Sequence, residues 1–214
     1  MEPSFLKINY QTRYFTLGKM TPKIRKVWIV LHGYGQLAPY FIKKFKILES
    51  EETFILAPEG LNRFYLESFS GKVGATWMTK EDRLTDISNY IEYLDSLYRK
   101  EIEKKISEDI QITLLGYSQG CATACRWIVQ TDFVIHRLIL WSGIIPPDLN
   151  LNLGRKKLKN KEIQVIYGNE DPFLKEKNPP EDIIRAFKEL QIDPLIKIFK
   201  GGHEIPEKVL QQFS

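Results

Sequence analysis

The sequence predicts an α/β protein with a mostly parallel, twisted sheet and helices on both faces of that sheet. Short apolar runs rich in branched side chains alternate along the chain with longer amphipathic stretches. Apolar runs without polar alternation are typical of strands buried on both faces, as in a parallel sheet covered by helices. A length of 214 residues suffices for one sizeable core and is short for two, so we expect a single domain over residues 1–214.

Six apolar runs are the expected strands of this sheet, and the first four of them are expected to be buried. They cover residues 26–31, 53–57, 110–115, 138–141, 162–167 and 195–199. Two further short strands, antiparallel to each other, are expected at the start of the chain, over 5–9 and 12–17.

Helices are predicted where apolar residues recur every three or four positions. The expected helices cover about 37–45, 82–105 and 181–190, and others follow Gly120 and Pro206. The segment 58–80 is interpreted as a long irregular loop, a type of segment that is often functional in compact domains. The basic run 155–161 is interpreted as a solvated loop.

Composition excludes several functional classes. The net charge of +4 is too weak to indicate nucleic-acid binding. No apolar run has the length of a membrane span or of a signal peptide, so we expect neither. Cys121 and Cys125 lie four residues apart on a predicted helix, where a disulfide is disfavoured, and we expect two buried thiols and a cytoplasmic location. This pair supplies only two ligands, so no metal site is expected.

A strand–turn–helix transition centred on Ser118 is the main chemical signal. The apolar run 110–115 continues into Gly116-Tyr117-Ser118-Gln119-Gly120, and small residues typical of a helix start follow. In this context G-x-S-x-G is typical of a nucleophile elbow, a tight turn that projects a serine hydroxyl from the carboxyl end of a strand. The sequence therefore predicts Ser118 as a nucleophile; the alternative is a glycine-rich turn without a catalytic role.

The general base is predicted by elimination among three histidines. His136 precedes a predicted strand and should lie at the wrong end of the sheet. His32 follows a strand but directly precedes Gly33, which is the context of an oxyanion loop. His203 follows the last strand through two glycines, so its imidazole can lie over the carboxyl ends of the strands.

The acid partner is expected at a strand end between the serine and the histidine. Asp171 follows the 162–167 strand and is the preferred candidate, with Glu170 as its nearest competitor and Asp148 and Asp193 as weaker ones. In such a triad the histidine takes the serine proton, and the aspartate holds the histidine tautomer and balances the imidazolium.

Two backbone N–H groups are predicted to stabilise the oxyanion of a tetrahedral intermediate. One belongs to Gln119, the residue after the nucleophile. The other is assigned to Tyr34 in the His32-Gly33-Tyr34-Gly35 segment, which follows an earlier strand. A plain strand-to-helix turn is the alternative interpretation of this segment.

Four motifs together resemble the α/β-hydrolase superfamily. They are HGYGQ at 32–36, GYSQG at 116–120, GNEDP at 168–172 and GGHEIP at 201–206. More narrowly, they are similar to the phospholipase/carboxylesterase group that includes acyl-protein thioesterases. The resemblance covers about residues 26–210 and implies a Ser118/Asp171/His203 triad, with Tyr34 and Gln119 as oxyanion donors. It also implies hydrolysis of carboxylic or thiol esters without a cofactor.

The segment between the predicted strands at 138–141 and 162–167 is too short for a helical cap. We therefore expect no large lid and an open cleft. Apolar side chains near the expected site are the candidate walls of an acyl pocket: Tyr34, Trp77, Ile144, Ile145 and Phe173. The expected substrates are small to medium acyl esters or thioesters. The alternatives are a serine peptidase or amidase on the same fold, and a binding protein without activity. The sequence does not define an oligomeric state.

Overall fold

A computed structural model of the chain describes residues 2–105, 107, 109–175 and 179–213. Within these residues the main sheet has seven strands in the order β1-β3-β2-β6-β7-β8-β9. The strands are β1 (Tyr14–Leu17), β2 (Lys26–Leu31), β3 (Thr53–Pro58), β6 (Gln111–Tyr117), β7 (Arg137–Trp141), β8 (Glu162–Gly168) and β9 (Leu195–Phe199). Strand β1 is antiparallel to β3, and every other neighbouring pair is parallel. The predicted fold class is confirmed, and each of the six predicted strands is present, although in β9 only Phe199 is buried.

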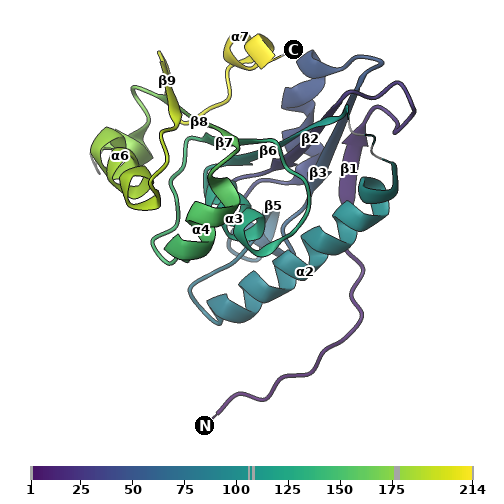
Figure 1. The fold of residues 1–214 in the computed structure, drawn as a ribbon. Coiled ribbons are helices and arrows are strands. Elements are labelled where there is room, and N and C mark those ends of the chain that lie inside the picture. Colours follow the sequence, from purple (N-terminus) through teal and green to yellow (C-terminus); the bar gives the residue numbers. More distant parts are fainter. Residues whose placement is uncertain (1, 106, 108, 176–178, 214) are drawn as a thin grey trace.

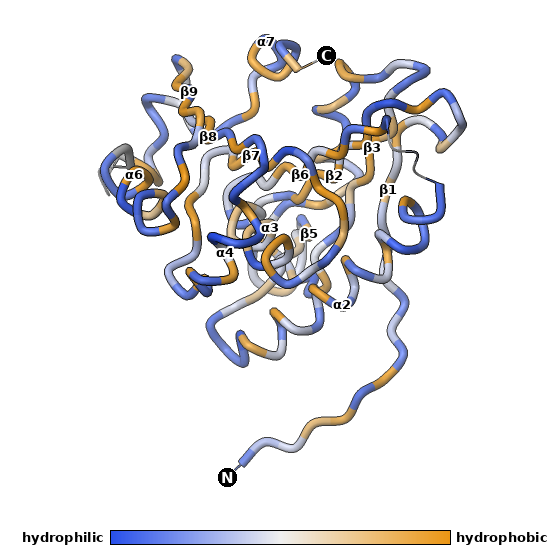
Figure 2. The backbone as a smooth tube through the Cα atoms, in the orientation of Figure 1, coloured by the Kyte–Doolittle hydropathy of each residue, from blue (hydrophilic) through white to orange (hydrophobic). Residues whose placement is uncertain are grey.

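Helices cover both faces of this sheet (Figure 1). One face packs against α2 (Arg83–Glu101), α3 (Gln119–Gln130), α4 (Leu151–Leu158) and α6 (Pro179–Leu190). The other face packs against α1 (Ala38–Phe41), the 3-10 helix η1 (Ile42–Leu48) and α7 (Glu207–Leu210), which continues into η3 (Gln211–Phe213). The short helix α5 (Pro172–Lys175) follows β8. Apolar colour is concentrated along the central strands in Figure 2, as expected for strands buried on both faces.

The prediction of a strand over 5–9 is wrong. This segment extends away from the sheet (Figure 1), and Phe5, Leu6 and Ile8 are exposed. The adjacent strand β1 pairs with β3 rather than with an N-terminal partner. A strand forms only where a neighbouring strand offers backbone hydrogen bonds, whatever the strand propensity of its residues. No neighbouring strand pairs with 5–9, so its apolar alternation does not produce a strand.

The segment 58–80 is not irregular. It contains an antiparallel hairpin of β4 (Asn62–Glu67) and β5 (Ser70–Thr76), which forms a separate two-stranded sheet. Most side chains of β4 are exposed, so the apolar signal of a buried strand is missing from the sequence. The hairpin is fixed to the body through Ala75, whose N–H donates to Gln36 O (3.1 Å) and whose carbonyl accepts from Gly35 N–H (2.9 Å).

The basic run 155–161 lies largely in helix α4 and is not a loop, which corrects the sequence interpretation. Asn150 caps this helix by accepting the Leu153 N–H at 3.0 Å. The three basic residues in its last turn are favourably placed against the helix dipole. The predicted helix at 37–45 is α-helical only in α1 and continues as the 3-10 helix η1.

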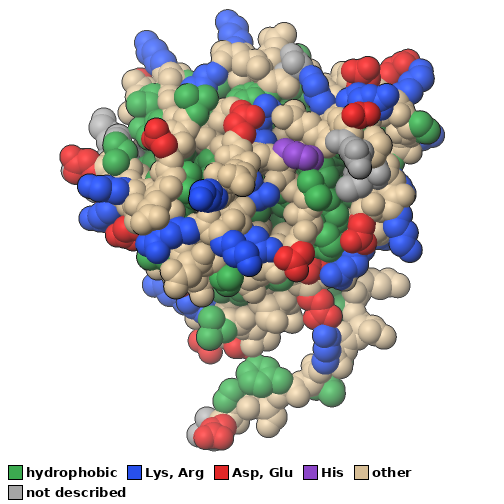
Figure 3. All heavy atoms as spheres, in the orientation of Figure 1, with side chains coloured by type: hydrophobic (Ala, Val, Ile, Leu, Met, Phe, Trp, Pro, Cys, Tyr) green, Lys and Arg blue, Asp and Glu red, His purple; other side chains and the backbone are tan. Residues whose placement is uncertain are grey.

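The surface carries both signs of charge. In Figure 3, Lys and Arg side chains are interspersed with Asp and Glu over the visible face. Among the described residues, no helix combines the length and apolar character needed to cross a bilayer.

Candidate active site

The turn between β6 and α3 has the geometry of a nucleophile elbow. Ser118 has φ 53° and ψ −116°, a conformation that costs energy in a non-glycine residue and is common at functional sites. A Cβ on Gly116 would lie 2.3 Å from Gly120 O, and a Cβ on Gly120 would lie 2.3 Å from Leu31 O. Both positions of the G-x-S-x-G motif therefore require glycine because backbone passes too close for any side chain.

A histidine–aspartate pair lies at the carboxyl ends of β8 and β9. His203 Nδ1 is 2.7 Å from Asp171 Oδ2, and the Asp171 carboxylate, which is 1% exposed, also accepts the Phe173 N–H at 3.0 Å. The imidazole ring contacts Tyr117, with ring centroids 5.1 Å apart, and the Tyr117 hydroxyl donates to His203 O at 2.6 Å. Because Tyr117 directly precedes Ser118, these contacts hold the imidazole beside the elbow. Among the described residues, His203 Nε2 has no hydrogen-bond partner.

The competing titratable residues are positioned for other roles. The Glu170 side chain is exposed, and Asp148 forms an ion pair with Arg126 at 2.7 Å. His136 Nδ1 accepts the Ile112 N–H at 3.0 Å, at the amino end of β6. Of the acids considered from the sequence, Asp171 is therefore the one that the fold brings to His203.

The segment after β2 lies against the elbow. A Cβ on Gly33 would lie only 3.1 Å from Ser118 Cβ. In this segment the Gly33 N–H donates to Gln36 Oε1 (2.9 Å), the Gly35 N–H to a β5 carbonyl (2.9 Å) and the Gln36 N–H to Gly33 O (3.2 Å). The Tyr34 N–H is left without an acceptor among the described residues. This N–H is therefore free for the oxyanion role that the sequence analysis assigns to it, and that role stays a prediction.

The Gln119 side chain has structural contacts that the sequence analysis missed. Its N–H occupies the first position of α3, where helical N–H groups lack an intrahelical acceptor. Its side chain joins the elbow to the end of the hairpin. Nε2 donates to Met78 O and Thr76 Oγ1, both at 2.9 Å, and Oε1 accepts the Trp77 N–H at 3.2 Å. A glutamine next to the predicted nucleophile was a usable signal, but its partners lie more than 40 residues away in sequence.

The prediction of Trp77 as a pocket wall is wrong. Trp77 is fully buried, and its indole N–H donates to His32 O at 2.8 Å. His32 is also buried, with Nδ1 2.8 Å from Gly33 O and Nε2 accepting the Gly60 N–H at 2.9 Å. The centroids of the two rings lie 5.0 Å apart, and both side chains contact the backbone of the 32–33 segment. Trp77 was predicted to be accessible to a substrate because the segment 58–80 was interpreted as a loop. The hairpin that buries this residue was not predicted.

His32 should make the stability of the protein depend on pH. Burial lowers its pKa from 6.5 to about 4. At a pH between these two values, His32 is protonated in the unfolded chain and neutral in the folded chain. The free energy of unfolding is therefore highest above pH 6.5 and decreases as the pH falls toward 4. The expected loss is about 3 kcal/mol. Urea unfolding at pH 7 and pH 4.5 should give a larger loss for wild type than for His32→Gln. Because His136 is present in both proteins, equal losses would contradict this assignment.

The two thiols are buried in α3, as predicted. Cys121 and Cys125 are unpaired, and burial raises the pKa of both, that of Cys125 to about 12. Cys121 Sγ donates to Gly116 O at 3.0 Å, so this side chain packs against the inside of the elbow.

The other four predicted wall residues lie in three different places. Tyr34 is 60% exposed, with its ring 5.1 Å from that of Phe64 on the hairpin. Phe173 is 68% exposed and lies edge-on to His203, with ring centroids 4.7 Å apart. Ile144 and Ile145 line a cavity of about 420 Å³ between the β7–α4 connection and α6. Of these contacts, the one between Phe173 and His203 reaches a predicted triad residue.

An apolar groove beside the 33–36 segment was not predicted from the sequence. It has a volume of about 550 Å³ and begins at Gly35, next to Tyr34. Its apolar walls come from α1 and the hairpin: Leu37, Tyr40, Phe41, Leu66 and Val73. The groove could not be predicted because one of its walls is the hairpin, which the sequence analysis interpreted as irregular.

Comparison with known proteins agrees with this geometry. Residues 19–214 match the model of the Phospholipase/Carboxylesterase family. The chain belongs to this family. It is a serine hydrolase with the α/β-hydrolase fold, and the family predicted from the sequence is confirmed.

Several solved structures share the fold. Esterase PE8 is 20% identical with a TM-score of 0.69, over 95% of this chain and 96% of the esterase. The Zea mays acyl-protein thioesterase 2 is 15% identical with a TM-score of 0.68, over 95% of this chain and 98% of its own. The Bacillus cereus carboxylesterase is 16% identical with a TM-score of 0.65, over 96% and 92% of the two chains. A search of curated protein sequences gave no match.

Proposed function

We propose that this family member hydrolyses small to medium carboxylic or thiol esters through an acyl-enzyme on Ser118. The observation that carries the proposal is the coupling of the Asp171–His203 pair, at 2.7 Å, to the strained elbow through Tyr117. A buried carboxylate on Nδ1 fixes the tautomer in which Nε2 can accept the serine proton. No cofactor takes part in this reaction.

The reaction follows from the positions of these groups. Ser118 Oγ attacks the acyl carbonyl as His203 accepts its proton, and Asp171 balances the resulting imidazolium. The N–H groups of Tyr34 and Gln119 stabilise the oxyanion, each contributing about 10²–10³ in rate. The imidazolium then protonates the leaving alcohol or thiol, and water releases the acyl group by the reverse path.

The apolar groove is our candidate for the acyl chain. Gly35, the residue after one proposed oxyanion donor, lines this groove, which makes it the apolar space to which we assign the acyl group. The β7–β8 connection contains only the eight-residue α4, so it supplies no helical cap over the site. Tyr34, Ile144, Ile145 and Phe173 would contact the remaining parts of the substrate.

Filling this groove should shorten the preferred acyl chain. Val73→Trp places an indole between the hairpin and α1, and we expect about a tenfold loss of kcat/KM for p-nitrophenyl octanoate with acetate almost unaffected. Ile144→Trp, which fills the cavity on the other side of the site, is the matched variant. If Ile144→Trp instead caused the selective octanoate loss, the acyl chain would lie along α6.

The proposal is tested by hydrolysis of p-nitrophenyl acetate through octanoate, and of the matching thioesters, by wild type and Ser118→Ala. Turnover that requires Ser118 supports an acyl hydrolase, and comparison of esters with thioesters defines the leaving group. A folded wild type without activity on any member of the series would contradict it.

We also infer that the enzyme acts in the cytoplasm. This inference rests on Cys121 and Cys125, two buried thiols that are left unpaired and are compatible with a reducing compartment.

A further inference from the structure

The segment that carries His203 crosses from β9 to α7 over residues 201–205, and we call it the histidine segment. Two glycines open it, and glycine leaves the backbone more conformational freedom than any other residue. The Gly201 N–H donates to Asn169 Oδ1 at 3.2 Å, and the Gly201 carbonyl accepts the Glu170 N–H at 2.9 Å. These bonds fix the start of the segment to the end of β8, but neither one reaches the histidine.

Two side chains from the sheet hold the rest of this backbone. The Tyr117 hydroxyl donates to His203 O at 2.6 Å. The Trp141 indole N–H donates to Glu204 O at 2.9 Å. Among the described residues, no other hydrogen bond joins the backbone of residues 202–205 to the remainder of the protein. The position of the histidine therefore depends on two aromatic donors that bind consecutive carbonyls.

Both donors lie in the interior at neighbouring strand ends. Tyr117 ends β6 and Trp141 ends β7, and the two residues are partners in the parallel pairing of these strands. They are 4% and 0% exposed, respectively. The Trp141 ring also contacts Phe199, with centroids 6.1 Å apart, and the Tyr117 ring contacts Phe41 at 5.9 Å. Because close packing restricts their rotamers, the two side chains present their donors at fixed points.

We propose that Trp141 is a positioning residue for the general base of the hydrolase. A single hydrogen bond from Tyr117 leaves the histidine segment able to pivot, and the indole supplies a second fixed point on the next peptide group. The two bonds together set the direction of the His203 backbone, and the Asp171 carboxylate, 2.7 Å from Nδ1, sets the rotation of the ring. This inference rests on the proposed acyl transfer at Ser118, in which a small displacement of a reacting group can cost about 10² in rate.

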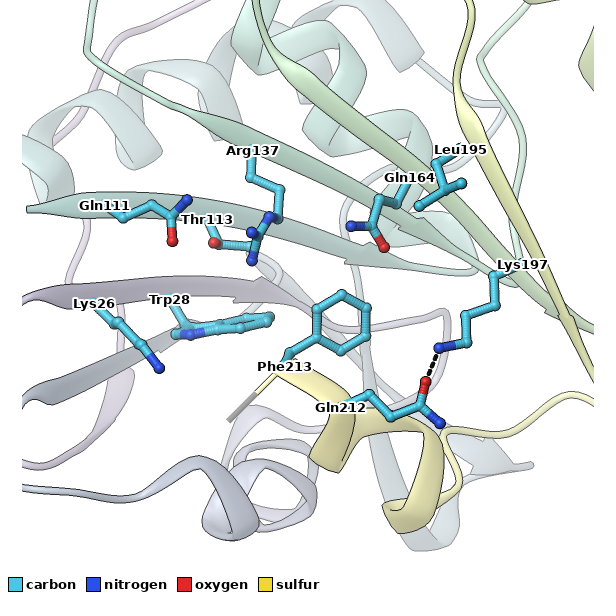
Figure 4. Close-up of a pocket in the computed structure, with 10 residues that line it drawn as sticks. All are labelled: Lys26, Trp28, Gln111, Thr113, Arg137, Gln164, Leu195, Lys197, Gln212 and Phe213. Atoms are coloured by element: carbon cyan, nitrogen blue, oxygen red, sulfur yellow. Dashed lines mark hydrogen bonds between the residues drawn. The ribbon is translucent and has the colours of Figure 1, made fainter.

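Removing the indole N–H should lower turnover without weakening substrate binding. For Trp141→Phe we expect kcat for p-nitrophenyl butyrate to fall about tenfold, with KM within about twofold, because the imidazole acts in the chemical step. The matched control is Trp28→Phe, the same change in the same core cluster. Trp28 packs against Phe213 beside a cavity that η3 borders (Figure 4), and among the described residues it has no hydrogen bond to the histidine segment. Urea unfolding should show similar losses of stability in both variants, and Trp28→Phe should keep kcat within about twofold.

Further variants separate positioning from general damage to the core. In the Asp171→Asn protein His203 is already held in the wrong state, so adding Trp141→Phe should cost less than about twofold in the single-turnover rate. A loss caused by a loosened core would be the same in both backgrounds. Tyr117→Phe should resemble Trp141→Phe, whereas Tyr98→Phe, which removes a hydroxyl that donates to a remote backbone carbonyl at 3.1 Å, should keep near-normal kcat.

The contrary outcomes are distinct from a failure of the proposed function. Near-normal kcat in folded Trp141→Phe, an equal loss in Trp28→Phe, or an undiminished loss in the Asp171→Asn background would each overturn the inference and leave acyl transfer at Ser118 in place. If Trp141→Phe does not fold, the benzothiophene analogue of tryptophan at position 141 repeats the test, because sulfur replaces the N–H in a ring of almost the same shape. The analogue should also lose kcat about tenfold, and full activity would be contrary. A wild-type protein without Ser118-dependent hydrolysis would overturn the proposed function, and this inference with it.

Discussion

Ser118→Ala is expected to lower kcat for ester hydrolysis by about 10⁶ and to leave the fold unchanged. Removing the hydroxyl removes the proposed nucleophile, and the oxyanion donors then have no covalent intermediate to stabilise. The loss of stability should be small, because alanine keeps the Cβ and the Ser118 hydroxyl has no hydrogen bond to another described residue. Hydrolysis rates and thermal unfolding of the two proteins provide the measurement.

A matched change nearby separates the hydroxyl from general damage to the site. Ser142, at the end of the neighbouring strand β7, also has a positive φ (50°) and is buried, but it lies outside the proposed triad. Ser142→Ala should retain most of the activity. Near-normal turnover by Ser118→Ala, or an equal loss in Ser142→Ala, would contradict the nucleophile assignment.

Asp171→Asn is expected to lower kcat by about 10⁴. An asparagine at this position can accept from or donate to His203 Nδ1 with little change in shape. The amide can hold the wrong histidine tautomer, and it does not balance the imidazolium. Because the Asp171 side chain is buried and lies 2.7 Å from the ring, no other group replaces it. The rate of p-nitrophenyl butyrate hydrolysis across pH 6–9 would measure the effect.

Glu170→Gln is the matched control, since it makes the same chemical change one residue earlier on an exposed side chain. It should keep nearly full activity. If Glu170→Gln caused the large loss and Asp171→Asn did not, the acid of the triad would be misassigned.

The parts of the structure that the sequence predicted well are those set by local pattern. Buried parallel strands are continuously apolar, so 26–31 and 110–115 were located closely. The glycines at 116 and 120 mark a turn that only glycine allows, and they placed Ser118 in advance. The positions of His203 and Asp171 followed from a property of parallel sheets, whose carboxyl ends all lie at one edge.

The parts that were missed depend on contacts between distant segments. The β4–β5 hairpin has mostly exposed side chains and is fixed by hydrogen bonds to the 33–36 segment, so its local sequence resembled a loop. Without the hairpin, the burial of Trp77 and the apolar groove were not predictable. The 5–9 segment is the converse case, because its apolar residues resembled a strand that has no partner in the fold.

The most direct test of the proposed mechanism is mass spectrometry of wild-type enzyme quenched in acid during turnover of p-nitrophenyl butyrate. We predict a butyryl adduct on the peptide that contains Ser118, at that residue, and none in the Ser118→Ala protein. An adduct on another residue, such as Cys121, or sustained turnover without any adduct in a burst-phase experiment, would contradict an acyl-enzyme at Ser118.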